Sequence, residues 1–250
     1  MRKLLIAILV FLLPFNRAFG THIAGGEMSY KWTGGNNFEI TLKLYRDCLT
    51  GSAAFDPFIV IGVFNKTSNA RIDTLLMSIQ QIDTVSLTGP SGPCAFPPNV
   101  CIEIGTYIDT IAIPNNPVGY YLSWERCCRN STVVNLQSPL QTGFAFYMEM
   151  PDPAIQNSSP VFLDDPLPFV CEGQPLNYNM AAVDPDGDLL VYELSDPLAG
   201  NLGYPTNIPP SYSHYPGTWS LRFHGMGTRL QSFKCMREQL QPINSECSYR

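Results

Sequence analysis

Three carboxylates lie within five residues in the sequence Asp184-Pro185-Asp186-Gly187-Asp188. On a tight turn such side chains can converge on a hard cation, and Ca²⁺ prefers oxygen ligands of this kind. The spacing differs from an EF-hand, because the glycine comes one position early and no glutamate closes the loop. The alternative is an ordinary Asp-Gly turn whose side chains are solvated or bind backbone N–H groups. We therefore expect either a calcium site at Asp184, Asp186 and Asp188 or a plain turn, and no other cofactor.

Eight cysteines form the second set of chemically active side chains, and an even number in an exported chain predicts disulfides. Cys127 and Cys128 are adjacent, and because a bond between neighbours strains the backbone, we expect them to have different partners. A zinc site is the rival interpretation, but no Cys-x-x-Cys pair occurs. A thiol activated by the flanking arginines is another. The disulfide candidates are Cys48, Cys94, Cys101, Cys127, Cys128 and Cys171, and the sequence leaves their pairing open.

Few residues suggest catalysis. Glu125 and Asp47 are acidic residues of the kind that glycosidases pair, but the sequence does not fix their separation, and rim-exposed strand positions explain them as well. The chain has no Gly-x-Ser-x-Gly, Walker, dinucleotide or His-Glu-x-x-His motif. Trp32 and Trp124 suit either a sugar-stacking face or a hydrophobic core. We predict that the protein is not an enzyme.

The first twenty residues have the pattern of a secretory signal peptide. Arg2 and Lys3 precede an apolar run over residues 4–15, and Ala18-Phe19-Gly20 supplies small residues for cleavage between Gly20 and Thr21. The alternative is an uncleaved membrane anchor, although the run is short for a span. We expect the mature protein to begin near Thr21 and to have no membrane span.

The composition argues against nucleic-acid binding. The net charge is −6, and only 14% of the residues are charged, without a basic patch or a block of like charge. Proline, glycine and aromatic residues are common instead. The length allows one large domain or two ordinary ones.

Alternating apolar residues predict an all-β fold. The clearest strand has Phe38, Ile40, Leu42 and Leu44 on one face, and the sequence Gly34-Gly35-Asn36-Asn37 before it is typical of a hairpin turn. Gly105 is expected to form a bulge or bend. Proline-rich segments separate the strands, which favours a sandwich or barrel-like domain. The expected strands are residues 27–32, 38–46, 58–65, 71–77, 82–87, 100–113, 120–127 and 143–150.

A domain boundary is predicted near residue 156, because Asn157-Ser158-Ser159-Pro160 reads as a polar linker. A second β pattern follows at residues 161–162, 169–171, 176–183 and 190–194. We interpret it as an incomplete immunoglobulin-like or cadherin-like domain. The expected organisation is a signal peptide at 1–20, a β-sandwich-like domain at 21–156, the partial domain at 157–215 and an irregular tail at 216–250.

The sequence resembles the N-terminal region of large secreted Bacteroidetes proteins labelled as gliding-motility-associated C-terminal domain proteins. Eight ordered segments carry the resemblance: Thr21-His22-Ile23-Ala24-Gly25-Gly26-Glu27-Met28-Ser29-Tyr30, Gly35-Asn36-Asn37-Phe38-Glu39-Ile40-Thr41-Leu42, Leu44-Tyr45-Arg46-Asp47-Cys48, Pro97-Pro98-Asn99-Val100-Cys101, Arg126-Cys127-Cys128-Arg129-Asn130, Asn157-Ser158-Ser159-Pro160-Val161-Phe162, Asp184-Pro185-Asp186-Gly187-Asp188 and Val191-Tyr192-Glu193-Leu194. The resemblance covers most of residues 21–195. It implies multi-domain surface proteins exported by the type IX route. Separately, the aspartate turn itself resembles the Asp-rich turns of cadherin-like repeats, where calcium rigidifies a domain junction.

The tail departs from that family. Relatives carry a Gly-Phe-Thr-Ala-Trp stretch after a Pro-Pro-x-Tyr segment, whereas here Pro209-Pro210-Ser211-Tyr212 is present without it. The resemblance also implies a C-terminal sorting domain for the last export step, and we expect that this chain lacks one. Residues 222–227 can encode that stretch if read one base later. We therefore hypothesise a frameshift after Tyr212, which would make Cys235 and Cys247 accidental.

The expected function is that of a non-catalytic secreted or cell-surface protein, adhesin-like or structural, associated with adhesion or gliding. Its partners would be cell-envelope proteins or surface polysaccharide. A carbohydrate-binding module of an outer-membrane system is the alternative, and a hydrolase is a third class that two carboxylates in a groove would favour.

Overall fold

The computed structural model describes residues 23–49, 53–85, 101–127, 139–165, 181–195, 198–200, 211–212, 220–225 and 230–234. Its regular structure is antiparallel β apart from two short 3₁₀ turns, Pro139–Gln141 and Pro153–Ile155. The predicted all-β class is therefore confirmed. The first seven strands are β1 (Ile23–Gly34), β2 (Asn37–Asp47), β3 (Phe58–Asn65), β4 (Arg71–Thr84), β5 (Ile102–Ala112), β6 (Tyr120–Arg126) and β7 (Phe144–Met150).

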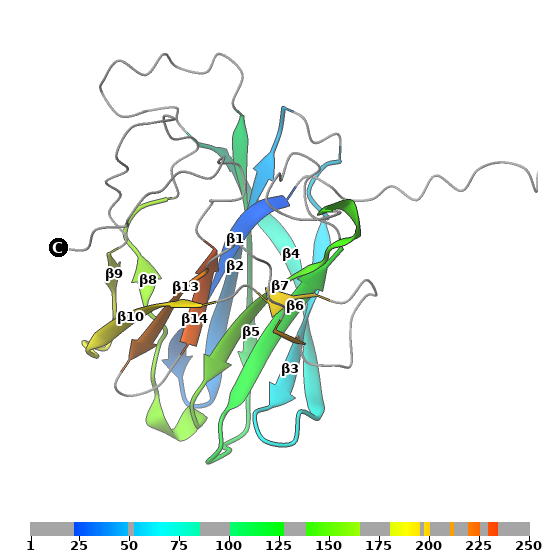
Figure 1. Ribbon diagram of the computed structural model, residues 1–250. Helices are drawn as coiled ribbons and strands as arrows, with labels where there is room; N and C mark the ends of the chain where they lie inside the picture. Colours follow the sequence, from blue (N-terminus) through cyan, green and yellow to red (C-terminus); the bar gives the residue numbers. More distant parts are fainter. Residues whose placement is uncertain are drawn as a thin grey trace, which may run out of the picture.

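These seven strands form two layers that share β4. The strand order is β1-β2-β5-β4-β3-β6-β7, and β4 pairs with β3 through its first half and with β5 through its second half. The irregularity between Ile79 and Gln81 marks the passage from one layer to the other. In Figure 1 the green strands β6 and β7 lie in front of the blue pair β1 and β2. The result is a sandwich-like fold.

The core lies between the two layers and follows the alternation of the sequence. Ile40 and Leu42 of β2 are fully buried, and so are Ile61 of β3 and Leu122 of β6. The hairpin is also as predicted, since Gly34 and Gly35 have φ values of +120° and +57° at the turn between β1 and β2. Positive φ suits glycine because it has no Cβ.

Two expectations about strands are wrong. Residues 71–77 and 82–84 belong to the single strand β4, whereas residues 86–87 of the second expected strand lie outside the described residues. Gly105 is not a bulge, because β2 and β5 pair without a shift. Gly105 instead leaves room for the Phe55 ring. A Cβ at this position would lie 2.9 Å from two atoms of that ring. The ring is buried there, with the Arg46 guanidinium 5.7 Å from its centroid.

The Gly105→Ala variant is expected to lose about 1–3 kcal/mol of unfolding free energy, because the Phe55 ring must move out of a packed site. The control is Gly25→Ala, where a Cβ would meet Tyr45 at an ordinary 3.6 Å and the change should stay within about 0.5 kcal/mol. Urea unfolding followed by circular dichroism measures both. Equal losses in the two variants would contradict the packing role of Gly105.

The chain beyond residue 156 is built onto this sandwich. Its strands are β8 (Val161–Phe162), β9 (Ala182–Val183), β10 (Leu190–Ser195), β11 (Leu198–Ala199), β12 (Ser211–Tyr212), β13 (Ser220–Gly225) and β14 (Leu230–Lys234). β14 joins β7 at the pair Gln231 and Met148, and β13 and β10 follow it in the same sheet. The two strands within residues 216–250 differ from the irregular tail that the sequence predicts.

A second small core covers the outer face of the layer that contains β2. Tyr45, Ile102 and Ile104 point away from the main core, and Phe162 of β8 and Ala182 of β9 pack against them. The residues of the predicted linker are themselves buried, with exposed fractions of 7% for Asn157, 4% for Ser158 and 2% for Ser159. The boundary predicted near residue 156 therefore falls on a buried segment rather than an exposed one, and the division of the chain into two domains stays a prediction.

Candidate functional site

The Asp184–Asp188 turn is organised by hydrogen bonds to the side chain and the carbonyl of Asp184. Asp184 Oδ1 accepts hydrogen bonds from the amides of Asp186 at 2.9 Å and Asp188 at 3.3 Å. Gly187 has a φ of +82°, and its amide donates to the Asp184 carbonyl at 3.2 Å. This is the hydrogen-bonded turn that the sequence offered as the alternative to a metal site.

The Asp186 carboxylate points to a different part of the chain. Its Oδ2 accepts a hydrogen bond from the Ser158 amide at 2.5 Å. Among the described residues, no group of three or more His, Cys, Asp or Glu side chains is arranged to hold a metal ion. The structure thus shows Asp184 and Asp186 in hydrogen bonds, and calcium binding by Asp184, Asp186 and Asp188 stays a prediction.

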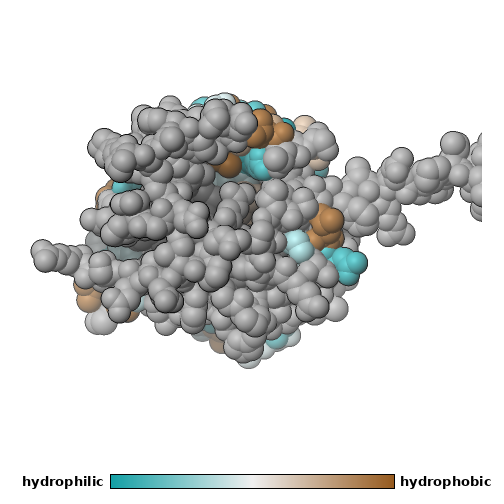
Figure 2. Space-filling model, turned by 45° about the horizontal axis from the view of Figure 1, so that its top comes forward, coloured by the Kyte–Doolittle hydropathy of each residue, from teal (hydrophilic) through white to brown (hydrophobic). Residues whose placement is uncertain are grey.

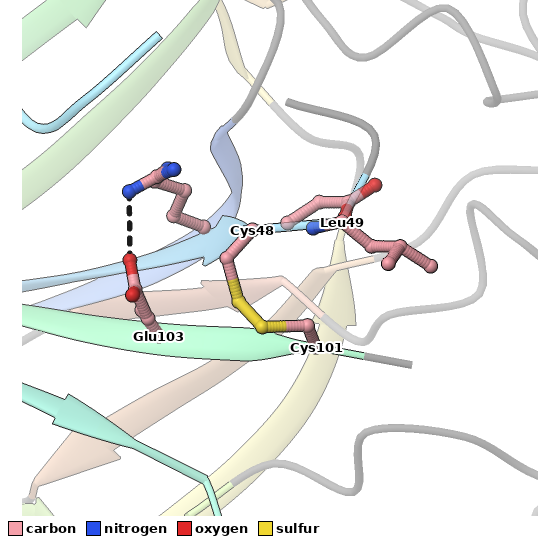
Figure 3. The surroundings of a disulfide bond; sticks show 6 residues. Cys48, Leu49, Cys101 and Glu103 are labelled. Atoms are coloured by element: carbon pink, nitrogen blue, oxygen red, sulfur yellow. Dashed lines mark hydrogen bonds and ion pairs between the residues drawn. A yellow bond between two sulfur atoms is a disulfide. The ribbon is translucent and has the colours of Figure 1, made fainter. Parts of the chain in front are cut away.

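Two cysteines close the end of the β2–β5 pair. Asp47 and Ile102 are the last paired residues, and Cys48 and Cys101 beyond them form a disulfide with a Cα–Cα distance of 5.2 Å. The Cys48 amide also donates to the Cys101 carbonyl at 3.0 Å. Figure 3 shows this bond and the nearby Glu103. Two paired positions further into the sheet, Glu103 forms an ion pair with Arg46 at 2.7 Å. The disulfide prediction is confirmed for these two residues.

Cys127 is disulfide-bonded too, at the end of β6, so the prediction of a structural half-cystine holds for it rather than that of an activated thiol. Its partner lies outside the described residues, as do the other disulfide candidates, Cys94, Cys128 and Cys171. The predicted cleavage site at Gly20 and Thr21 lies outside them as well.

The two acidic residues considered for glycoside hydrolysis are not rim-exposed. Asp47 is 8% exposed and accepts a hydrogen bond from the Leu49 amide at 2.9 Å, while Glu125 is 7% exposed on the outer face of β6. The expectation that both lie at an exposed rim is therefore wrong.

The two tryptophans serve the core. Trp124 is 1% exposed between Phe144 and Phe146, with ring centroids at 6.0 and 5.9 Å. Trp32 packs against the same core and donates from Nε1 to the Gly35 carbonyl at 2.9 Å. Of the two sequence interpretations, the structure therefore favours the core over a sugar-stacking face for both residues.

A buried polar cluster on the outer face of β3, β6 and β7 was missed from sequence. The Tyr121 ring stacks between Phe64 and Tyr147, at centroid distances of 4.9 and 5.1 Å. Glu149, 7% exposed, binds Lys66 Nζ at 2.5 Å and accepts from the Tyr147 hydroxyl at 2.8 Å. Alternation along β6 places Tyr121 opposite to the core, which suggests exposure, and only the two adjacent tyrosines at 120 and 121 hint that both faces are covered.

Burial raises the pKa of Tyr121 to about 12, and the nearby Glu125 carboxylate adds to the effect. The pKa of Tyr121 in the folded protein lies above that of an unfolded tyrosine, which is about 10. The stability that this difference contributes is therefore fully present below about pH 10 and is lost as the pH rises toward 12. The urea midpoint should fall between pH 9.5 and pH 11.5 (about two units of pH) and fall less in Tyr121→Phe. The same decline in both proteins would contradict this role of the Tyr121 hydroxyl.

A second charged cluster joins the layer of β1 and β2 to the following chain. Lys43 Nζ lies 3.0 Å from Glu27 and 3.7 Å from Asp165. Burial raises the pKa of Glu27, and the Lys43 ammonium offsets only part of that rise. Burial lowers the pKa of Lys43, but the carboxylates of Glu27 and Asp165 outweigh it and the net shift is upward. The ion pair between Lys43 and Asp165 thus links the chain after β8 to the sandwich.

No protein-family model, curated protein or solved structure matched this chain. The described residues contain no helix that is long and apolar enough to cross a membrane. The family resemblance of the sequence therefore stays a prediction.

Proposed function

We propose that the chain is a non-catalytic, secreted or cell-surface protein of the bacterial envelope, which acts as an adhesin-like or structural scaffold. The observation that carries this proposal is the disulfide between Cys48 and Cys101, together with the bonded Cys127. Disulfides persist in oxidising compartments outside the cytosol. The signal-like sequence of residues 1–20 agrees with export.

The way the described chain is tied together supports a scaffold role. One disulfide closes the β2–β5 end, the ion pair of Lys43 and Glu27 links neighbouring strands, and Phe162 covers Tyr45 on the outer face. Such contacts between distant segments keep a β surface rigid, and rigidity lowers the entropy cost of binding a partner. Adhesion or gliding is the process that the sequence resemblance suggests.

The non-catalytic part of the proposal is supported by the use of buried acidic groups. Glu149 is held by Lys66 and Tyr147, and Asp47 by the Leu49 amide. In each case the contact satisfies a buried carboxylate, as stability requires. Carbohydrate binding is the alternative function, and it would use exposed aromatic rings to stack on sugars. Trp32 and Trp124 do not favour it, because they pack in or against the core.

The proposal is tested by locating the protein and measuring attachment in the producing bacterium. We expect the chain in the outer-membrane or culture fraction, accessible to protease on intact cells, and we expect its deletion to reduce attachment or gliding. Tight binding of the purified chain to one polysaccharide on a glycan array would favour the alternative. A cytosolic location with unchanged attachment would contradict the proposal.

A further inference from the structure

Strand β1 is an edge strand whose outward backbone groups need partners. Among the strands that the structure describes, β1 is hydrogen-bonded in the sheet order to β2 alone, while β7 and β14 lie near it without pairing. Along an antiparallel strand, alternate residues direct their N–H and C=O groups to opposite sides. Tyr30 and Trp32 point theirs away from β2, and Ser29 and Lys31 therefore point theirs toward it. An open edge of this kind is a template for pairing with another chain.

Residues 157–159, here named the strap, occupy that edge. The Tyr30 amide donates to Ser159 Oγ at 2.8 Å, and the Tyr30 carbonyl accepts from the Ser159 amide at 2.8 Å and from its hydroxyl at 3.1 Å. The Trp32 amide donates to Ser158 Oγ at 3.3 Å. Two serine hydroxyls and one amide thus take the place of a neighbouring strand.

Two further hydrogen bonds hold the strap in place. Asn157 Nδ2 donates to the Tyr30 hydroxyl at 3.2 Å, and the Ser158 amide donates to Asp186 Oδ2 at 2.5 Å. The second contact links the strap to the Asp184–Asp188 turn, which lies 28 residues further along the chain. The strap residues are all less than 9% exposed. The strap is therefore held against β1 by specific hydrogen bonds and is not a loose surface loop.

We propose that the strap is an edge guard that stops β1 from pairing with β1 of a second copy of this chain. Two identical antiparallel strands are self-complementary about a two-fold axis. In a pair centred on Trp32, Tyr30 of each copy lies opposite Gly34 of the other, and Lys31 lies opposite Thr33, so that no like charges are opposed. The edge covered by the strap is therefore the edge that self-pairing needs. This inference does not depend on the proposed function.

The test removes both hydroxyls in Ser158→Ala/Ser159→Ala and measures mass by light scattering across a range of protein concentrations. The native chain should be monomeric and the variant should form dimers at higher concentration. In a dilute solution of the variant, amide hydrogen exchange at Tyr30 and Trp32 should be about tenfold faster than in the native protein. The amides of Ser29 and Lys31 should stay protected, because they face β2. The matched control is Ser68→Ala, whose hydroxyl accepts from the Ala70 amide in an exposed turn.

Asp186→Ala provides a second route that leaves both serines in place, and it should give weaker dimerisation in the same direction. A folded double variant that exchanges fast at Tyr30 and Trp32 yet stays monomeric would overturn the guard role. Unchanged exchange at these two amides would also overturn it, because the strap would then not be what protects the edge.

Discussion

Replacing Trp124 with alanine is expected to lower the free energy of unfolding by about 3–5 kcal/mol. The side chain is 1% exposed at the centre of the sandwich, and its ring lies nearly parallel to that of Phe146, at an interplanar angle of 19°. Removal leaves a cavity that the packed strands β6 and β7 can fill only in part. Guanidinium unfolding followed by far-ultraviolet circular dichroism measures the loss.

Two further variants separate the cavity from other effects. The Trp124 Nε1 proton donates to no acceptor among the described residues, and a buried donor without a partner is unfavourable. Trp124→Phe removes that donor and keeps the six-membered ring, so it leaves a smaller cavity and its cost should be clearly below that of Trp124→Ala. Phe58→Ala, at a ring 58% exposed, should change stability by about 0.5 kcal/mol or less. A loss below about 1 kcal/mol for Trp124→Ala would contradict the core we describe.

Replacing Cys48 and Cys101 together with serine is expected to cost about 2–5 kcal/mol. The two residues are 53 positions apart, so that the bond closes a long loop and restricts the unfolded chain. In the folded state the variant loses the covalent link where β2 and β5 stop pairing. Urea unfolding of the variant and of the unreduced native protein gives the difference.

Leu49→Ala is the control for the disulfide variant, because Leu49 adjoins Cys48 and is 54% exposed. Its effect should stay within about 0.5 kcal/mol. Equal urea midpoints for the serine variant and the native protein would show that the disulfide does not stabilise this end of the sheet.

Local patterns predicted the strands well. The alternation of Phe38, Ile40, Leu42 and Leu44 placed β2, and the glycines at 34 and 35 placed its hairpin, because both signals depend only on neighbouring residues. The pairing of Cys48 with Cys101 could not be predicted. It depends on β2 lying beside β5, and nothing local to either cysteine encodes that adjacency.

The outer contacts escaped prediction for the same reason. Asn157, Ser158 and Ser159 have the composition of a linker, and they are buried because their polar groups bond to an edge strand that the sequence does not reveal. The Asp186 carboxylate also accepts a hydrogen bond from the Ser158 amide, and no local pattern in the sequence points to that contact. In the sequence, polar side chains that hydrogen-bond to the backbone of a distant strand cannot be told from solvent-exposed ones.

The exposed surface adds little to this account. Figure 2 shows hydrophobic residues beside hydrophilic ones in small areas among the described residues visible on that face. Exposed apolar side chains scattered in this way are normal for folded proteins. The functional inference therefore rests on the disulfides and on the contacts that tie the chain together.

Peptide mapping by mass spectrometry, on protein recovered without reductant from the producing bacterium, tests the central claim most directly. The claim is that the chain is an exported β-sheet scaffold held together by disulfide bonds. It predicts a peptide pair linked through Cys48 and Cys101 in the envelope or culture fraction, and a mature chain that starts near Thr21. Free thiols at both positions, in protein found only in the cytosol, would contradict it.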